Sequence, residues 1–223
     1  MKLTPDDKAD VARHEALLAE LLQIAEHVLV ENPQVELCPR QVALLERLES
    51  AFAGQNCPPG ISLLSGGLAE DDYRSPAAIR YLDAVDTTPR HDWRALEPQL
   101  LRACEDALQY LEPKAFCYVL PAYLRQYLLR PDFMCTDSIF FVMSHTSWNS
   151  REKLALLTPA QRSVVQDVMN EYRWREQTIN GDCDDSLLPW EYDCYRSEGS
   201  DVSAHTYAGN LALEYAMRFG MVN

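Results

Sequence analysis

The stretch PKAFCYVLPAYLRQYLLRP, residues 113–131, decides the fold class of this 223-residue chain. Aromatic and aliphatic residues occupy it almost throughout, and Tyr118, Tyr123 and Tyr127 lie on or near one side of it at helical spacing. Core packing is the usual role of such a stripe. Pro121 lies inside the stretch, and an internal proline removes a backbone hydrogen bond and clashes with the preceding turn. We therefore expect a buried helix with a kink or a restart at this proline.

Helix start signals lie on both sides of this stretch. A proline is tolerated at the first position of a helix because its missing N–H would have no partner there. Seven dipeptides have this form: Thr4-Pro5, Cys38-Pro39, Ser75-Pro76, Thr88-Pro89, Glu97-Pro98, Glu112-Pro113 and Thr158-Pro159. Thr4, Ser75 and Thr158 are also candidate N-caps, and Asp7 completes a capping box with Thr4.

Apolar spacing completes the prediction of the helices. They are expected over about 5–32, 39–52 with a stop at Gly54, 76–82, 98–111, 158–176 and 203–219. The turn-rich residues 55–72 are expected to form a long loop. SIFFVMSH, residues 138–145, fits a strand or a buried helix, and we favour a helix.

No segment shows a clear alternating strand pattern, so the fold class is mainly α. We expect a single compact multi-helix domain with irregular loops over residues 1–175. Residues 176–223 are expected to add an acidic loop and a C-terminal helix packed on the same domain.

The charge of the chain limits its partners. It carries 20 Lys and Arg against 34 Asp and Glu, a formal net charge of −14. Residues 176–223 alone hold 2 basic and 9 acidic residues, a net charge of −7. Such a field repels nucleic-acid phosphates and anionic membranes, and it favours encounter with a basic protein. The alternative is that the acidity only keeps the protein soluble.

The expected compartment is the cytoplasm. The first residues, MKLTPDDKAD, have no apolar region of a signal peptide, and no window approaches the ~18 apolar residues of a membrane helix. The seven cysteines, which lack CxxC spacing, are expected to be reduced: Cys38, Cys57, Cys104, Cys117, Cys135, Cys183 and Cys194. Cys104 and Cys117 are interpreted as buried hydrophobic residues, and a pairing of Cys183 with Cys194 stays open.

Four quoted segments carry a resemblance: RLESAFAG (47–54), DWRAL (92–96), YVLPAYL (118–124) and LLTPAQR (156–162). On these segments the chain resembles an uncharacterised family of small bacterial domains. The signature of that family is a Y-x-L-P-A-Y-L helix followed by L-T-P-x-Q. The resemblance covers about residues 45–170, which makes residues 1–44 an N-terminal helical addition. It implies no activity, cofactor or catalytic residue.

The stretch NGDCDDSLLPWEYDCYRSEGSD, residues 180–201, combines seven carboxylates with aromatic residues. Trp and Tyr are enriched at interface centres, where a charged rim steers the approach of the partner. The predicted partner-binding residues are Asp182, Asp184, Asp185, Trp190, Glu191, Tyr192, Asp193, Tyr195 and Glu198. Alternatively, the apolar members of this stretch only attach the tail to its own core.

Catalytic and metal sites have weaker support. A calcium loop beginning at Asp182 would need glycine where Leu187 stands and glutamate where Asp193 stands. Neither Cys183 nor Cys194 has a nearby histidine or a close cysteine pair for zinc. A dyad of Cys117 or Cys135 with His145 is conceivable, but a core thiol and a loop histidine are the preferred interpretation. We therefore expect no catalytic residue, metal or cofactor.

The leading hypothesis is a non-catalytic acidic binding protein, best described as a bacterial immunity protein that neutralises a basic toxin effector by direct binding. The protein is expected to be a monomer or a weak homodimer, without nucleic-acid or membrane partners. The alternative is an enzyme or metal-dependent protein that uses the acidic cluster from Asp182 to Asp193. A third possibility is a homo-oligomeric scaffold.

Overall fold

The computed structural model describes residues 3–67, 75–133, 139, 142–143 and 150–180, and this part of the chain contains helices and loops but no β-strand. The predicted mainly α class is thus confirmed. In chain order the elements are α1 (Pro5–Glu31), α2 (Pro39–Ala51), α3 (Leu63–Gly67), α4 (Pro76–Val85), the 3-10 helix η1 (Trp93–Ala95), α5 (Pro98–Ala103), α6 (Ala107–Tyr110), α7 (Pro113–Leu129), α9 (Ser150–Ala155) and α10 (Pro159–Asn180).

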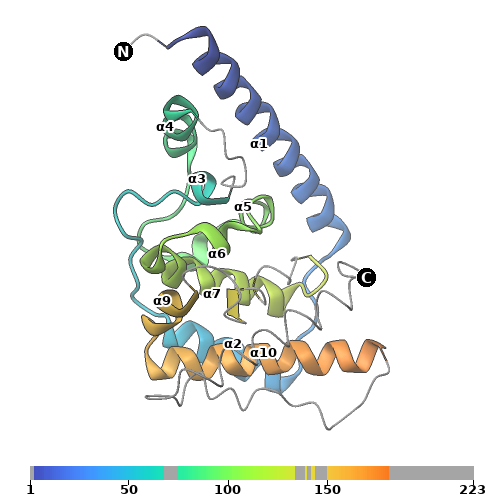
Figure 1. The fold of residues 1–223 in the computed structure, drawn as a ribbon. Coiled ribbons are helices and arrows are strands. Elements are labelled where there is room, and N and C mark those ends of the chain that lie inside the picture. The colour runs from blue at the N-terminus through green and yellow to red at the C-terminus, as the bar shows by residue number, and fades with distance from the viewer. Residues whose placement is uncertain (1–2, 68–74, 134–138, 140–141, 144–149, 181–223) are drawn as a thin grey trace, which may run out of the picture.

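The helices are arranged around α7 (Figure 1). Helices α2 and α10 lie side by side and form a layer against one side of α7. Helices α5 and α6 contact α7 from the opposite side, and α9 also contacts it. The long helix α1 runs obliquely along one edge of the molecule, where it contacts α5 and α4. The centre of the fold is therefore α7, and α1 is a peripheral element.

Six of the seven predicted Xaa-Pro pairs begin a helix. The capping box of α1 is present: Thr4 Oγ1 accepts a hydrogen bond from Asp7 N at 3.1 Å, and the Asp7 carboxylate accepts one from Thr4 N at 3.0 Å. Helix α10 begins in the same way, since Thr158 Oγ1 accepts from Gln161 N at 3.3 Å and Gln161 Oε1 accepts from Thr158 N at 2.9 Å. These local bonds satisfy N–H groups that a helix leaves unpaired at its start.

The pair Thr88-Pro89 does not begin a helix, so this prediction is wrong. The backbone around it is used by tertiary contacts instead. Pro89 O accepts a hydrogen bond from the hydroxyl of Tyr118, and Arg90 O accepts one from Cys57 N at 2.9 Å. The carbonyls that a helix would use for its own hydrogen bonds therefore connect this loop to α7 and to the loop after α2.

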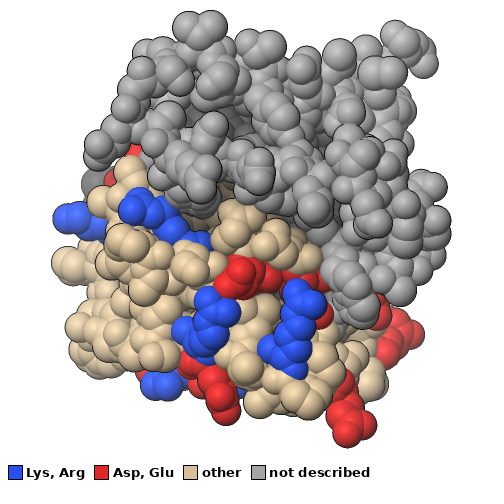
Figure 2. Space-filling view, turned by 90° about the horizontal axis from the view of Figure 1, so that it is seen from below, with Lys and Arg blue, Asp and Glu red and all other residues tan. Residues whose placement is uncertain are grey.

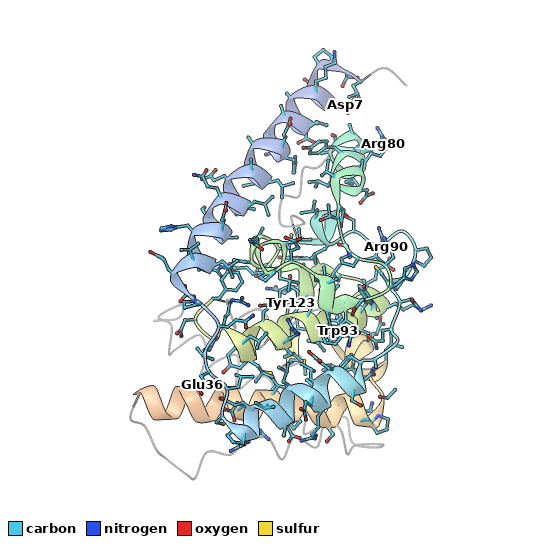
Figure 3. The ribbon with its side chains drawn as sticks, turned by 180° about the vertical axis from the view of Figure 1, so that it is seen from behind. Asp7, Glu36, Arg80, Arg90, Trp93 and Tyr123 are labelled. Atoms are coloured by element: carbon cyan, nitrogen blue, oxygen red, sulfur yellow. The ribbon has the colours of Figure 1, made fainter. Side chains whose placement is uncertain are left out.

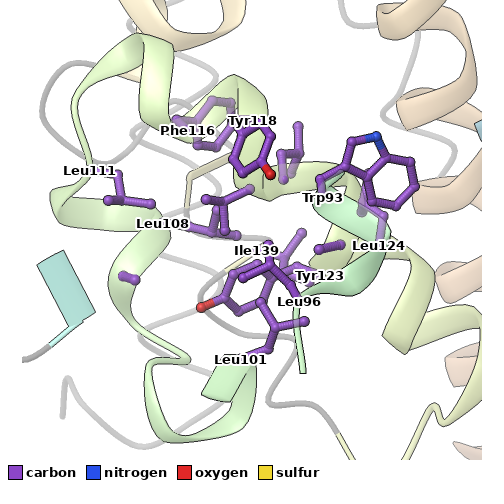
Figure 4. Close-up of a cluster of buried hydrophobic side chains, with 14 of the residues drawn as sticks. Trp93, Leu96, Leu101, Leu108, Leu111, Phe116, Tyr118, Tyr123, Leu124 and Ile139 are labelled. Atoms are coloured by element: carbon purple, nitrogen blue, oxygen red, sulfur yellow. The ribbon is translucent and has the colours of Figure 1, made fainter. Parts of the chain in front are cut away.

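Helix α7 is continuous from Pro113 to Leu129, so the chain does not restart at Pro121. Thirteen of its 17 residues are buried, including the three tyrosines of the predicted stripe, which confirms the expected core packing. The hydroxyl of Tyr123 donates to Cys104 O, which leaves neither group unpaired in the interior. Figure 4 shows this cluster, in which Phe116, Tyr118 and Tyr123 pack with Trp93.

Two other segments differ from the prediction. The expected loop 55–72 contains α3, in which Leu63 and Leu64 are buried in the core. The expected helix 98–111 is divided into α5 and α6, and Cys104 lies at the division with its carbonyl bound to Tyr123. In both cases contacts with distant parts of the chain decide the local structure.

The other predicted helices are confirmed where the structure describes them. Helix α2 ends at Ala51, and Gly54 follows with φ +72°, a conformation that favours glycine. Within the expected helix 138–145, Ile139, Val142 and Met143 are helical and buried. The predicted last helix, 203–219, lies outside the described residues.

Candidate functional site

The nine predicted partner-binding residues, from Asp182 to Glu198, all lie outside the described part of the chain. Their role therefore stays a prediction. The same holds for Cys135 and His145, the conceivable catalytic pair, and for the possible link between Cys183 and Cys194. The described residues offer other charged surfaces and several buried polar groups.

The layer formed by α2 and α10 carries charges of both signs. Arg47 on α2 binds Asp167 on α10, with Nη2 and Oδ2 2.7 Å apart. The buried Glu171 accepts a hydrogen bond from Gln41 Nε2 at 2.7 Å and lies 3.7 Å from Arg40 Nε. Viewed from this side, basic and acidic side chains are interspersed (Figure 2). The described charges of this layer therefore include both signs.

The outer side of α1 has a different composition. Between Arg13 and Arg40 the chain holds five glutamates and no lysine or arginine. All five are exposed: Glu15, Glu20, Glu26, Glu31 and Glu36. Figure 3 shows the side chains on the outer side of α1, which faces away from α4, and places Glu36 in the connection to α2. Between Arg13 and Arg40, the charged side chains of this surface are therefore all acidic.

A row of residues three apart leads from the buried side of α1 onto this outer side. Residues three apart turn 300° around a helix, so each step of an i, i+3 row moves 60° from the previous one. Leu18 is buried, Leu21 is half-buried, Ile24 is 49% exposed and Val30 is 76% exposed. His27 lies between the last two, with its Nε2 3.4 Å from Glu31 Oε1. We call Ile24, His27 and Val30 the outer ridge.

Three of the four described cysteines, Cys57, Cys104 and Cys117, are poor candidates for a nucleophile. Burial raises the pKa of Cys104, raises the pKa of Cys117 to about 11, and raises the pKa of Cys57 despite the nearby Arg90. A reactive thiolate needs the opposite shift, towards a lower pKa. Cys104 is buried as predicted, whereas Cys117 is only partly buried. These three thiols serve as core or loop contacts.

Arg90 joins two loops near these thiols. Its Nη1 donates to Ile61 O at 2.7 Å and contacts Cys57 Sγ at 3.3 Å. Figure 3 shows Arg90 near Trp93, whose indole N–H donates to Phe52 O at 2.9 Å. The guanidinium therefore fastens the loop after α2 to the loop before η1.

The buried Lys153 is a polar group that sequence reasoning missed. Its side chain is inaccessible to solvent, and Nζ donates to Leu108 O at 2.8 Å and to Gln109 O at 2.6 Å. The ammonium also lies 5.7 Å from the ring centroid of Phe116. Burial lowers the pKa of Lys153 to about 8. Since both carbonyls belong to α6, the lysine joins α9 to that helix.

The sequence holds only a weak signal for the burial of Lys153, which is the apolar residues that follow it. Leu154 comes next in the chain, and Leu157 lies four residues on, the spacing of neighbours on a helix surface. Both leucines are buried. Long basic side chains usually extend to solvent from such a position, which is why the pattern alone predicts exposure.

Neither a metal site nor a membrane span is found in the described residues. Their His, Cys, Asp and Glu side chains form no group of three or more that could hold a metal ion. Their helices also lack the combination of length and apolar character that crossing a bilayer requires.

Comparison with known proteins supplies the family. A family model described as "Family of unknown function (DUF6714)" matches residues 40–188, two thirds of the chain. The chain belongs to this family. The DUF6714 match extends beyond residues 45–170 at both ends, so it includes α2, α10 and the first part of the acidic stretch. Helix α1 and residues 189–223 lie outside it. No curated protein and no solved structure matches the chain.

Proposed function

We propose that this DUF6714 protein is a non-catalytic, cytoplasmic binding protein that neutralises a basic effector, in the manner of a bacterial immunity protein. The observation that carries the proposal is the distribution of charge. The net charge is −14, and residues 176–223 contribute −7 of it together with Trp190, Tyr192 and Tyr195. Residues 14–39 contribute five further glutamates without a lysine or arginine.

Physical chemistry links this distribution to binding. A surface of one sign raises the rate of encounter with a partner of opposite sign. Aromatic side chains then supply apolar area at little cost in conformational entropy, as is common at interface centres. A toxin that acts on nucleic acid or nucleotides has a basic active site, and an acidic protein can cover it.

The thiols of Cys57, Cys104 and Cys117 and the amine of Lys153 are poor nucleophiles, which is consistent with a non-catalytic role. A thiol nucleophile needs a lowered pKa or an adjacent base, and the pKa values of Cys57, Cys104 and Cys117 are raised. Lys153 has a lowered pKa, but its amine is buried and bound to two carbonyls.

Binding to the product of a neighbouring toxin-like gene tests the proposal. The two proteins are mixed at micromolar concentration for gel filtration, and they are co-expressed to measure growth. We expect a complex and rescue of growth. Absence of both would refute the proposed function.

A double charge reversal locates the contact within the acidic stretch. Asp184→Lys with Asp185→Lys should weaken the complex strongly at low salt, because it inverts the local field, and should leave the melting temperature unchanged. The matched control is Glu46→Lys with Asp83→Lys, which reverses two exposed acids of α2 and α4.

The alternative, an enzyme or metal-dependent protein, makes a different prediction. Calorimetric titration of the full chain with Ca²⁺, Mg²⁺ and Zn²⁺ should show no tight binding for an acidic protein interface. A micromolar site that is lost in Asp182→Asn with Asp193→Asn would favour the alternative.

A further inference from the structure

We infer that the outer ridge of α1, formed by Ile24, His27 and Val30, is a second contact surface for the basic effector. The inference rests on the proposed function and deepens it. The proposed partner would then contact two surfaces, the outer ridge on the described part of the molecule and the acidic stretch of residues 180–201.

The described core leaves the outer ridge exposed. Helix α1 uses its other side to contact α4 and α5, where it buries His14, Leu18 and Ala25. The i, i+3 row leaves this buried side, so exposure increases from Leu18 to Val30. Single exposed apolar residues are ordinary, but a row that continues from the core onto an acidic surface matches the arrangement of an interface.

The charge around the ridge decides which kind of partner binds it. The five exposed glutamates of residues 14–39 have no lysine or arginine among them. A second copy of the chain would bring ten carboxylates together, and anionic lipid or nucleic acid would be repelled in the same way. A protein that presents apolar side chains flanked by Lys and Arg complements both features of the ridge.

The ridge also lies outside the family unit, the matched residues 40–188. Residues 1–39 lie outside the DUF6714 match, which begins at the first turn of α2. Four of the eight large hydrophobic side chains that are exposed in the described residues fall in this short part: Leu3, Ile24, Val30 and Val35. Half of the exposed large apolar side chains of the described residues thus lie outside the family unit, and Ile24 and Val30 lie in a part of α1 that holds glutamates but no lysine or arginine.

Two variants of the full chain test the inference against the purified product of the neighbouring toxin-like gene. Ile24→Ser with Val30→Ser removes the apolar contacts. Glu20→Lys with Glu31→Lys reverses the charges beside them, and lysine near the C-terminus of α1 is favourable for the helix itself. We expect each variant to raise Kd at least tenfold, measured by calorimetry at 50 mM NaCl. At 300 mM NaCl the effect of the charge reversal should shrink, whereas that of the serine variant should persist.

Matched controls come from the family unit. Leu156 is 50% exposed, almost the same as Ile24, so Leu156→Ser controls for loss of an exposed apolar side chain. Glu46→Lys with Asp83→Lys controls for charge reversal. Both controls should change Kd less than twofold, and circular dichroism melts should show that all variants fold.

The outcomes separate the inference from the proposed function. If the wild-type chain binds the effector and both α1 variants bind it equally well, the ridge is not a contact and the inference fails, while the proposed function stands. If the wild-type chain does not bind, the proposed function fails and the inference with it. If sedimentation shows a wild-type dimer that Ile24→Ser with Val30→Ser dissociates, a second copy covers the ridge and the inference is overturned.

Discussion

Helices α1 and α7 both begin with proline at their first position, yet they differ greatly in how many of their residues are buried. Helix α7 buries 13 of its 17 residues, whereas α1 buries three of its 27. The shorter helix therefore contributes more to the core than the longer one. A helix start signal therefore predicts where a helix begins, but it does not predict how many residues of that helix become buried.

The same comparison separates stability from binding. Helix α7 lies inside the DUF6714 match and at the centre of the molecule, while α1 lies outside the match and at the edge. Substitutions in and around α7 should change the free energy of unfolding. Substitutions on the outer side of α1 should leave it nearly unchanged and act on partner binding instead.

The largest effect is expected from Phe116→Ala. The ring is fully buried in α7 and lies beside the Lys153 ammonium, so its removal leaves a cavity and removes the cation–π contact. We expect the free energy of unfolding to fall by about 3 to 5 kcal/mol, measured by urea denaturation. A loss below ~1 kcal/mol would mean that α7 is not the centre of the core.

The next effect depends on pH and on Lys153. Burial lowers its pKa to about 8, against about 10.5 in the unfolded chain. Between these values the unfolded chain binds the proton and the folded chain does not, so the contribution of the lysine to stability rises with pH. The maximum rise is on the order of 3 kcal/mol.

Lys153→Met isolates this contribution, because every other titrating group is common to both proteins. The free energy of unfolding of the wild type minus that of Lys153→Met should increase between pH 8 and pH 10.5. A constant offset is expected as well, since methionine leaves Leu108 O and Gln109 O without their donor. A difference that does not change with pH would contradict a lowered pKa.

A smaller effect comes from the two capping boxes. Thr158→Ala removes the cap of α10, and Gln161 of that box also donates to Ala51 O in α2 at 3.2 Å. We expect a loss of about 1 kcal/mol. Thr4→Ala should cost less than about 0.5 kcal/mol, because the first turn of α1 can fray without exposing the core. If urea denaturation showed the same loss in the free energy of unfolding for both variants, the expected difference between α10 and the peripheral α1 would be contradicted.

The smallest effect is expected from Val30→Ser. The side chain is 76% exposed, and serine has nearly the same helix propensity as valine. The free energy of unfolding should therefore change by less than about 0.5 kcal/mol. A larger loss would show that α1 depends on contacts of its outer side, and would weaken its assignment as a binding surface.

Sequence patterns predict the features that depend on neighbouring residues. Thr4 with Asp7, and Thr158 before Pro159, mark helix starts because their side chains reach backbone groups within three residues. The same reasoning fails at Thr88-Pro89, where a helix would have needed carbonyls that bind Tyr118 and Cys57. It also misses α3, a single short helix held by buried leucines.

The candidate sites also combine features that the sequence predicts with features that it does not. The excess of acidic residues and their uneven distribution are visible without a structure. The outer ridge is not, because Leu18, Leu21, Ile24 and Val30 form one apolar row whose buried and exposed ends differ only after α1 packs on α4 and α5. Lys153 is missed for a similar reason, since its two acceptors lie more than 40 residues away.

By itself, the sequence determined the mainly α class, most helix starts and a negative charge that favours basic partners. These properties depend on composition and on bonds within one helical turn. Only the tertiary structure decided which helix became the core, which side of α1 stayed open and which lysine was buried. Those outcomes depend on contacts between distant segments, whose free energy no local pattern contains.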